Sequence, residues 1–100
     1  MRLHPLGGGT LNIINDEASA SVLAGGYSNS IGTHAYQSTL SGGLGNMIGT
    51  VAEMAVIAGG EMNAAWGSRG TIGGGASNEV SGARSVVSGG SRNRALAADA

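Results

Sequence analysis

The chain has 100 residues, a formal net charge of −1 at pH 7 and no cysteine. This length permits one domain, and the near-zero charge gives no electrostatic basis for binding nucleic acid or an anionic membrane surface. The lack of cysteine excludes a disulfide framework and thiol chemistry. No apolar stretch is long enough to cross a membrane, so direct membrane insertion is not expected.

The pattern Gly-Gly-x-x-Asn occurs six times along the chain, at intervals of seventeen residues and then of fifteen. Self-similarity at a fixed period is the signature of solenoids and other stacked arrays. These glycines and asparagines are therefore predicted to form structural turns and ladders. In chain order they are Gly8, Gly9, Asn12, Gly25, Gly26, Asn29, Gly42, Gly43, Asn46, Gly59, Gly60, Asn63, Gly74, Gly75, Asn78, Gly89, Gly90 and Asn93.

Two aliphatic columns accompany the six copies. The first lies two residues before the glycines and follows a mostly β-branched residue, and the second lies two residues after the asparagine. Both share one parity with the asparagine, so on a strand these side chains point to the same face. The first column is Leu6, Leu23, Leu40, Ile57, Ile72 and Val87, and the second is Ile14, Ile31, Ile48, Ala65, Val80 and Ala95.

Each copy is predicted to form a short strand, a turn, a second short strand and another turn. β-branched residues suit strands, Gly-Gly suits a corner with positive φ or close backbone approach, and asparagine is expected to tolerate the left-handed conformation. Stacked copies make an all-β fold, a β-solenoid of six 15–17-residue coils, with one repeat domain over residues 1–100 that belongs to a longer array. The two extra residues of the longer intervals predict a larger loop along one edge, around Asn15–Ala18, Thr33–Tyr36 and Thr50–Glu53.

The residues just before the first aliphatic column have the opposite parity and predict a second apolar face. One coil buries few aliphatic side chains, so parallel, in-register association of identical chains is expected to supply further burial, in a closed cyclic assembly. Small residues next to this column would let two backbones approach closely. The column is Pro5, Val22, Thr39, Val56, Thr71 and Val86.

Two segments carry a resemblance to a known family: GGGASNEVSGARS (Gly73–Ser85) and SGARSVVSGGSRNRA (Ser81–Ala95). They are similar to the head repeats of trimeric autotransporter adhesins, the YadA-like head, and similar repeats occur in phage tail fibres. The resemblance covers Leu6 to Ala98, although the seventeen-residue intervals are longer than the family's typical repeat. It implies a left-handed parallel β-roll from each of three chains, packed about a common axis.

The resemblance also implies a passive extracellular role, in which the fibre binds a surface or holds a binding tip away from the cell. The expected partners are two further copies of the chain and a host surface receptor, matrix protein or glycan. The expected location is a bacterial cell surface, by anchoring in the outer membrane, or a virion tail fibre.

No catalytic, cofactor-binding or metal site is predicted, and the chain is not expected to be an enzyme. His4 and His34 occupy unrelated positions of the repeat, and the adjacent Asp16 and Glu17 point to opposite sides of any strand, unlike an acid–base pair. A calcium roll needs acidic ligands on a nonapeptide beat, which differs from the period found here. A polysaccharide lyase on a β-helix would need clustered acids or bases in one groove.

Charged residues recur one coil apart near the end of the chain. Glu79 and Arg94 occupy equivalent positions and are expected to form an exposed ion pair of little energetic value. Arg69 and Arg84 also occupy equivalent positions, where a solvated edge is favoured over an anion site.

The variable residues next to the glycines predict a mildly apolar stripe of Leu11, Tyr27, Leu44 and Met62. The stripe is a candidate adhesive surface, partner contact or part of the subunit interface. Trp66 stands where the interval changes from seventeen to fifteen, and either fills space there or contributes to binding.

The function that these features favour is a non-catalytic structural or adhesive segment of a trimeric surface fibre. Two alternatives are a phage tail-fibre segment for host attachment and an ice-binding β-solenoid. Ice binding would need a flat, regular threonine ladder, whereas Thr39 and Thr71 alternate with valine.

Overall fold

The computed structural model describes residues 9–100, so the predictions made for His4, Pro5, Leu6 and Gly8 lie outside the described residues. The described part contains no helix, and its strands are two residues long. They are β1 (Ile13–Ile14), β2 (Val22–Leu23), β3 (Ser30–Ile31), β4 (Thr39–Leu40), β5 (Met47–Ile48), β6 (Val56–Ile57), β7 (Ala64–Ala65), β8 (Thr71–Ile72), β9 (Glu79–Val80), β10 (Val86–Val87) and β11 (Arg94–Ala95).

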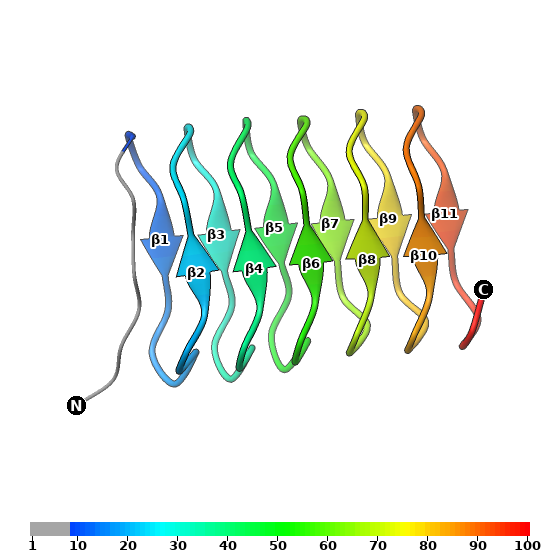
Figure 1. Cartoon of the computed structure of the whole chain (residues 1–100), viewed down its shortest axis with the longest axis horizontal. Helices are drawn as coiled ribbons and strands as arrows, with labels where there is room; N and C mark the ends of the chain where they lie inside the picture. The colour runs from blue at the N-terminus through cyan, green and yellow to red at the C-terminus, as the bar shows by residue number, and fades with distance from the viewer. Residues whose placement is uncertain (1–8) are drawn as a thin grey trace.

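Successive strands alternate between two parallel sheets, so the chain winds as a solenoid (Figure 1). The odd-numbered strands form a six-stranded sheet and the even-numbered strands a five-stranded sheet. Isolated parallel bridges add a third ladder, which runs from Thr10 to Ser91 through the same position of each coil. The predicted all-β solenoid is confirmed, with about five turns in the described residues instead of the six coils predicted for the whole chain.

The core is a thin layer between the two sheets. In nearly every strand the second residue is buried and the first faces outward, as the shared parity of the two aliphatic columns predicts. Leu23, Leu40 and Ile57 from one sheet and Ile31 and Ile48 from the other have no exposed surface. The Cα trace measures 35 × 22 × 13 Å, so the shortest dimension holds little more than these two facing columns.

The Gly-Gly corner lies at the upper edge of Figure 1. The second glycine of each pair has positive φ, for example 93° at Gly26 and 97° at Gly43, and in every pair except the last a Cβ atom there would overlap the backbone of the next coil. The first glycine has room for a side chain: at Gly59 a Cβ would meet no atom within 4 Å, although its φ is 153°. Within the Gly-Gly pairs, only the second position combines positive φ with a backbone contact too close for a side chain.

The asparagines of residues 9–100 do not take the left-handed conformation that this residue type tolerates. In the repeats that conformation falls on the residue before the asparagine, as at Ser28 (φ 56°) and Met62 (φ 55°). The reason is that the asparagine side chain points into the solenoid, where its amide binds the backbone of two coils.

The larger loops are confirmed along the opposite edge, at the bottom of Figure 1. The wide loops, residues 15–21, 32–38 and 49–55, each contain two left-handed residues, such as His34 and Gln37. The narrow loops, residues 66–70 and 81–85, contain one each, Arg69 and Arg84. A buried alanine column, Ala18, Ala35 and Ala52, fills the space inside the wide loops.

Candidate binding surfaces

The asparagine column is an internal hydrogen-bond ladder. The Asn46 amide donates to the carbonyl oxygens of Gly42 (2.8 Å) and Gly60 (2.9 Å), and its Oδ1 accepts from the backbone amide of Asn63 (3.0 Å). Asn29, Asn46, Asn63 and Asn78 are at most 1% exposed. No ligand can reach these amides without opening the solenoid, so their contribution is to the stability of the Gly-Gly corner.

A second internal ladder uses serine and was not predicted from the sequence. The Ser38 hydroxyl donates to the carbonyl oxygen of Ala52 (2.9 Å) and accepts from the backbone amide of Ala55 (3.1 Å). Ser21 makes the equivalent bonds to Ala35 and to the Ser38 amide. The signal available in the sequence was the recurrence of serine directly before the β-branched residue, at Ser21, Ser38 and Ser85.

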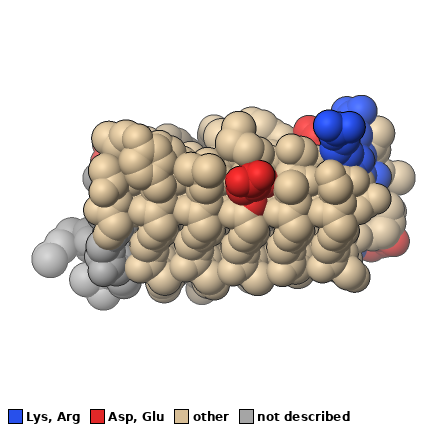
Figure 2. Space-filling model, turned by 90° about the horizontal axis from the view of Figure 1, so that it is seen from above, with Lys and Arg blue, Asp and Glu red and all other residues tan. Residues whose placement is uncertain are grey.

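The predicted apolar stripe forms two neighbouring rows on the upper edge. Tyr27 and Leu44 are bridge partners in adjacent coils, whereas Leu11 and Met62 lie one position further along their coils, in the left-handed row. The Met62 side chain lies over Gly45 and so borders Leu44. All four side chains are at least 44% exposed. Figure 2 shows this edge as largely uncharged, with arginine gathered towards the C-terminal end.

Trp66 lies apart from this edge, directly after β7 on the outer face of the six-stranded sheet. Its ring covers Gly49 in the preceding coil, where a side chain on the glycine would overlap the indole. The ring remains 44% exposed. Trp66 thus covers the last wide coil at the point where the coil length changes.

The outer face of the five-stranded sheet has two columns without a charged residue. The central column, Val22, Thr39, Val56, Thr71 and Val86, is exposed at its two end members and partly buried at its three middle members. The column beside it is exposed and consists of small residues, Ala24, Ser41, Ala58, Gly73 and Ser88. These two columns together are called the flat face below.

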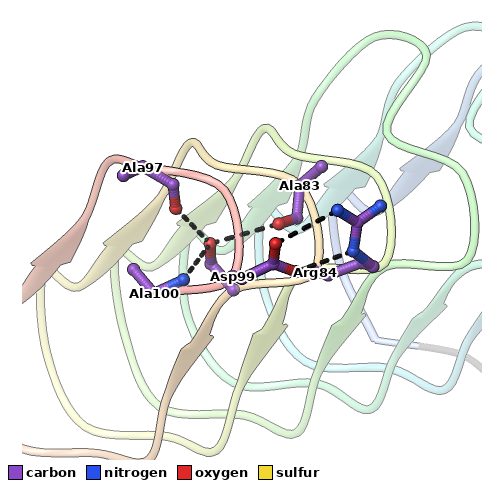
Figure 3. Close-up of polar contacts among 6 residues, drawn as sticks. Ala83, Arg84, Ala97, Asp99 and Ala100 are labelled. Carbon is purple, nitrogen blue, oxygen red and sulfur yellow. Dashed lines mark hydrogen bonds and ion pairs between the residues drawn. The ribbon is translucent and has the colours of Figure 1, made fainter.

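Two arginine–carboxylate ion pairs within residues 9–100 connect equivalent positions of adjacent coils. The pair between Glu79 and Arg94 is confirmed, with Nε to Oε1 at 2.9 Å. Arg84 forms a fork with Asp99, in which Nε and a terminal guanidinium nitrogen donate to the two carboxylate oxygens at 2.7 and 3.2 Å (Figure 3). The hydrogen bonds and charge of Arg84 lower the pKa of Asp99, and Asp99 correspondingly raises the pKa of Arg84.

The Arg84–Asp99 pair predicts a small acid-dependent loss of stability. Because the folded-state pKa of Asp99 is depressed, its contribution is present above the pKa of the unfolded chain and lost as the pH falls through the folded-state value. Urea unfolding of the native chain and of Asp99→Asn between about pH 2 and pH 6 checks this. The difference between the two chains should shrink at low pH. A difference that stays constant with pH would contradict the prediction.

The remaining polar candidates form no site. His34 lies 4.0 Å from Glu17 of the preceding coil, with both side chains near half exposure. Among residues 9–100, no three His, Cys, Asp or Glu side chains are grouped so that they could hold a metal ion. The same part of the chain has no helix long and apolar enough to cross a membrane.

The chain was compared with known proteins, and the role of the chain has to be argued from the repeat pattern and its geometry. No protein-family model, curated protein or solved structure matches the chain.

Proposed function

We propose that this chain is a non-catalytic structural and adhesive segment of a homotrimeric extracellular fibre, similar to the YadA-like head of trimeric autotransporter adhesins. The flat face is the observation that carries the proposal. Val56 and its column neighbours are outward-facing β-branched residues with part of their surface in solvent, and the residues beside them are small and exposed, so a second surface could approach the sheet closely.

Burial of the flat face against two further copies is consistent with the thinness of the core. Each coil buries one side chain from each aliphatic column in a body whose shortest dimension is 13 Å. Covering the central column in an assembly would remove further apolar surface from water, at about 25 cal/mol per Å². Parallel association in register would repeat the same contact in each coil. The number of chains is taken from the family resemblance.

Attachment to a host receptor, matrix protein or glycan is the proposed role of the variable outer surfaces, on a bacterium or on a phage tail fibre. The exposed Tyr27–Leu44 pair at the Gly-Gly edge fits such a contact. Ice binding ranks lower, because Val56 lies between Thr39 and Thr71 on the flat face and interrupts a threonine ladder.

The assembly is tested by measuring the mass of the chain in solution by light scattering, with Val56→Lys as the disrupting variant. The native chain is expected to have the mass of three chains, and Val56→Lys that of one, because burying the lysine charge in the interface is unfavourable. Ala64→Lys is the matched control, since Ala64 is a half-buried outward residue of the next strand on the other sheet. It should remain trimeric. A folded, β-rich monomer of the native chain would overturn the proposal.

A further inference from the structure

The change of coil length creates a step along the loop edge of the solenoid (Figure 1). Each wide loop has two left-handed residues, and the row made by the first of them ends at Val51, because the narrow loops have no counterpart. The last wide loop therefore overhangs the first narrow loop. The Ser68 hydroxyl donates to the Val51 carbonyl oxygen (3.3 Å), which ties the two loops together at the step.

The second left-handed row continues across the step. The Arg69 amide donates to the Glu53 carbonyl oxygen (2.7 Å), and the Arg84 amide to that of Ser68 (2.9 Å). This register places the side chains of Met54, Arg69 and Arg84 in one outward row. This row and the residues just before its members line an open pocket of about 240 Å³ beside the step; the lining residues are Glu53, Met54, Ser68, Arg69, Ala83 and Arg84.

The charged groups of this pocket differ in whether they have a partner. Asp99 holds the Arg84 guanidinium in a fork and fixes its orientation (Figure 3). Arg69 and Glu53 line the same pocket, yet within residues 9–100 neither forms an ion pair. The pocket thus offers a guanidinium that can donate and a carboxylate that can accept, side by side with the apolar groups of Met54 and Ala83.

We propose that this step pocket binds one hexose-sized sugar residue of a surface glycan, a role that rests on the proposed adhesive function and names its ligand class. Vicinal hydroxyls of a sugar both donate and accept, so they match a carboxylate and a guanidinium together. Met54 and Ala83 can contact the C–H groups of the ring. The volume is below the roughly 300–1,000 Å³ of pockets for drug-sized ligands, which fits a single ring.

The presence of Glu53 favours a neutral sugar over an anion. A carboxylate in the same pocket repels an anionic ligand, whereas it accepts hydrogen bonds from neutral hydroxyls. A sugar acid or a free sulfate is expected to bind only if attraction to the guanidinium groups outweighs repulsion by the Glu53 carboxylate. The experiment therefore includes both anions as probes.

The test is saturation-transfer NMR on the 100-residue chain with a panel of probes: glucose, galactose, mannose, their N-acetyl derivatives, glucuronate and inorganic sulfate. At least one neutral hexose is expected to bind, and Arg69→Ala and Glu53→Ala are each expected to weaken that binding by about tenfold or more, the effect of losing a hydrogen bond to a charged group. Arg92→Ala is the matched control, because Arg92 is exposed with φ 59°, close to the 60° of Arg69, but lies at the other corner. It should bind like the native chain.

Three outcomes overturn the proposal: no hexose binds, Arg69→Ala or Glu53→Ala binds as well as the native chain, or only glucuronate and sulfate bind. The solution mass, measured on the same samples, separates this result from the proposed function. If the chain is a trimer and binds no sugar, the sugar-binding proposal is wrong and the fibre proposal stands. If it is a monomer and binds sugar through Arg69, the fibre proposal is wrong and the sugar-binding proposal stands.

Discussion

Gly43→Ala is expected to destabilise the solenoid by about 3 kcal/mol or more. Gly43 has φ 97°, which a side chain disfavours, and a Cβ atom would overlap the carbonyl oxygen of Gly60 in the next coil. The coils would have to separate locally, which would break the bridge ladder beside this corner. Urea unfolding followed by circular dichroism measures the loss as a lower midpoint.

Two other glycines separate the causes of this effect. Gly59→Ala tests conformation alone, because φ is 153° and no atom lies within 4 Å of the added Cβ. Gly89→Ala tests neither cause, since its φ is not in the left-handed region and its surroundings are open. Stability should fall in the order Gly89→Ala, Gly59→Ala, Gly43→Ala, with the first change within about 0.5 kcal/mol of the native chain. Equal losses at Gly43 and Gly59 would show that close packing of coils contributes nothing.

Asn46→Ala is expected to cost about 2–4 kcal/mol, because it leaves buried backbone groups without partners. The backbone amide of Asn63 loses its acceptor and the Gly42 carbonyl oxygen loses its donor, whereas the Gly60 carbonyl oxygen keeps the hydrogen bond from the Leu44 backbone amide (3.0 Å). Asn93→Ala is the control: Asn93 is exposed, and its amide donates to Gly89 (2.8 Å). That change should cost about 1 kcal/mol or less. The same unfolding measurement compares the two variants, and equal losses would contradict a structural role of the buried ladder.

The stability of the Asn46→Asp variant is expected to depend on pH, which tests the same buried ladder in a second way. A carboxylate at this position would face the carbonyl oxygens of Gly42 and Gly60, so the folded state would favour the protonated acid and raise its pKa. The variant should therefore be most stable below the unfolded-state pKa of about 4 and lose stability as the pH rises from that value through the higher folded-state pKa. Unfolding midpoints that do not decline between about pH 3 and pH 7 would contradict this.

The strands and the core were predictable because they depend on local parity and on a repeat that is visible along the chain. Leu23 and Ile31 are buried because each lies at an even spacing from the asparagine between them, and the pleat sends such residues to one face. The wider loops were predictable for the same reason, since aligning the repeats puts the two extra residues of the seventeen-residue intervals between the strands. The Glu79–Arg94 pair followed from equal positions in adjacent coils.

The candidate surfaces were only partly predictable, because they depend on where side chains point after the coils stack. Leu11 and Tyr27 looked like members of one stripe, yet they differ by one position within their coils and lie in different rows. Arg69 and Arg84 looked equivalent, yet Asp99 binds only Arg84. The sequence places both arginines one coil apart but does not show which neighbour a long, rotatable side chain will reach.

The sequence by itself determined the solenoid, its period, its buried columns and the edge that carries the wide loops, because each follows from spacing along the chain. Only the tertiary structure decided that the residue before the asparagine takes the left-handed conformation, that the asparagine amide binds two coils from inside, and that Trp66 covers Gly49. It also decided that a pocket lies beside Arg69, next to the step between coil lengths. These features arise from contacts between coils, where one side chain occupies space left by a residue fifteen or seventeen positions away.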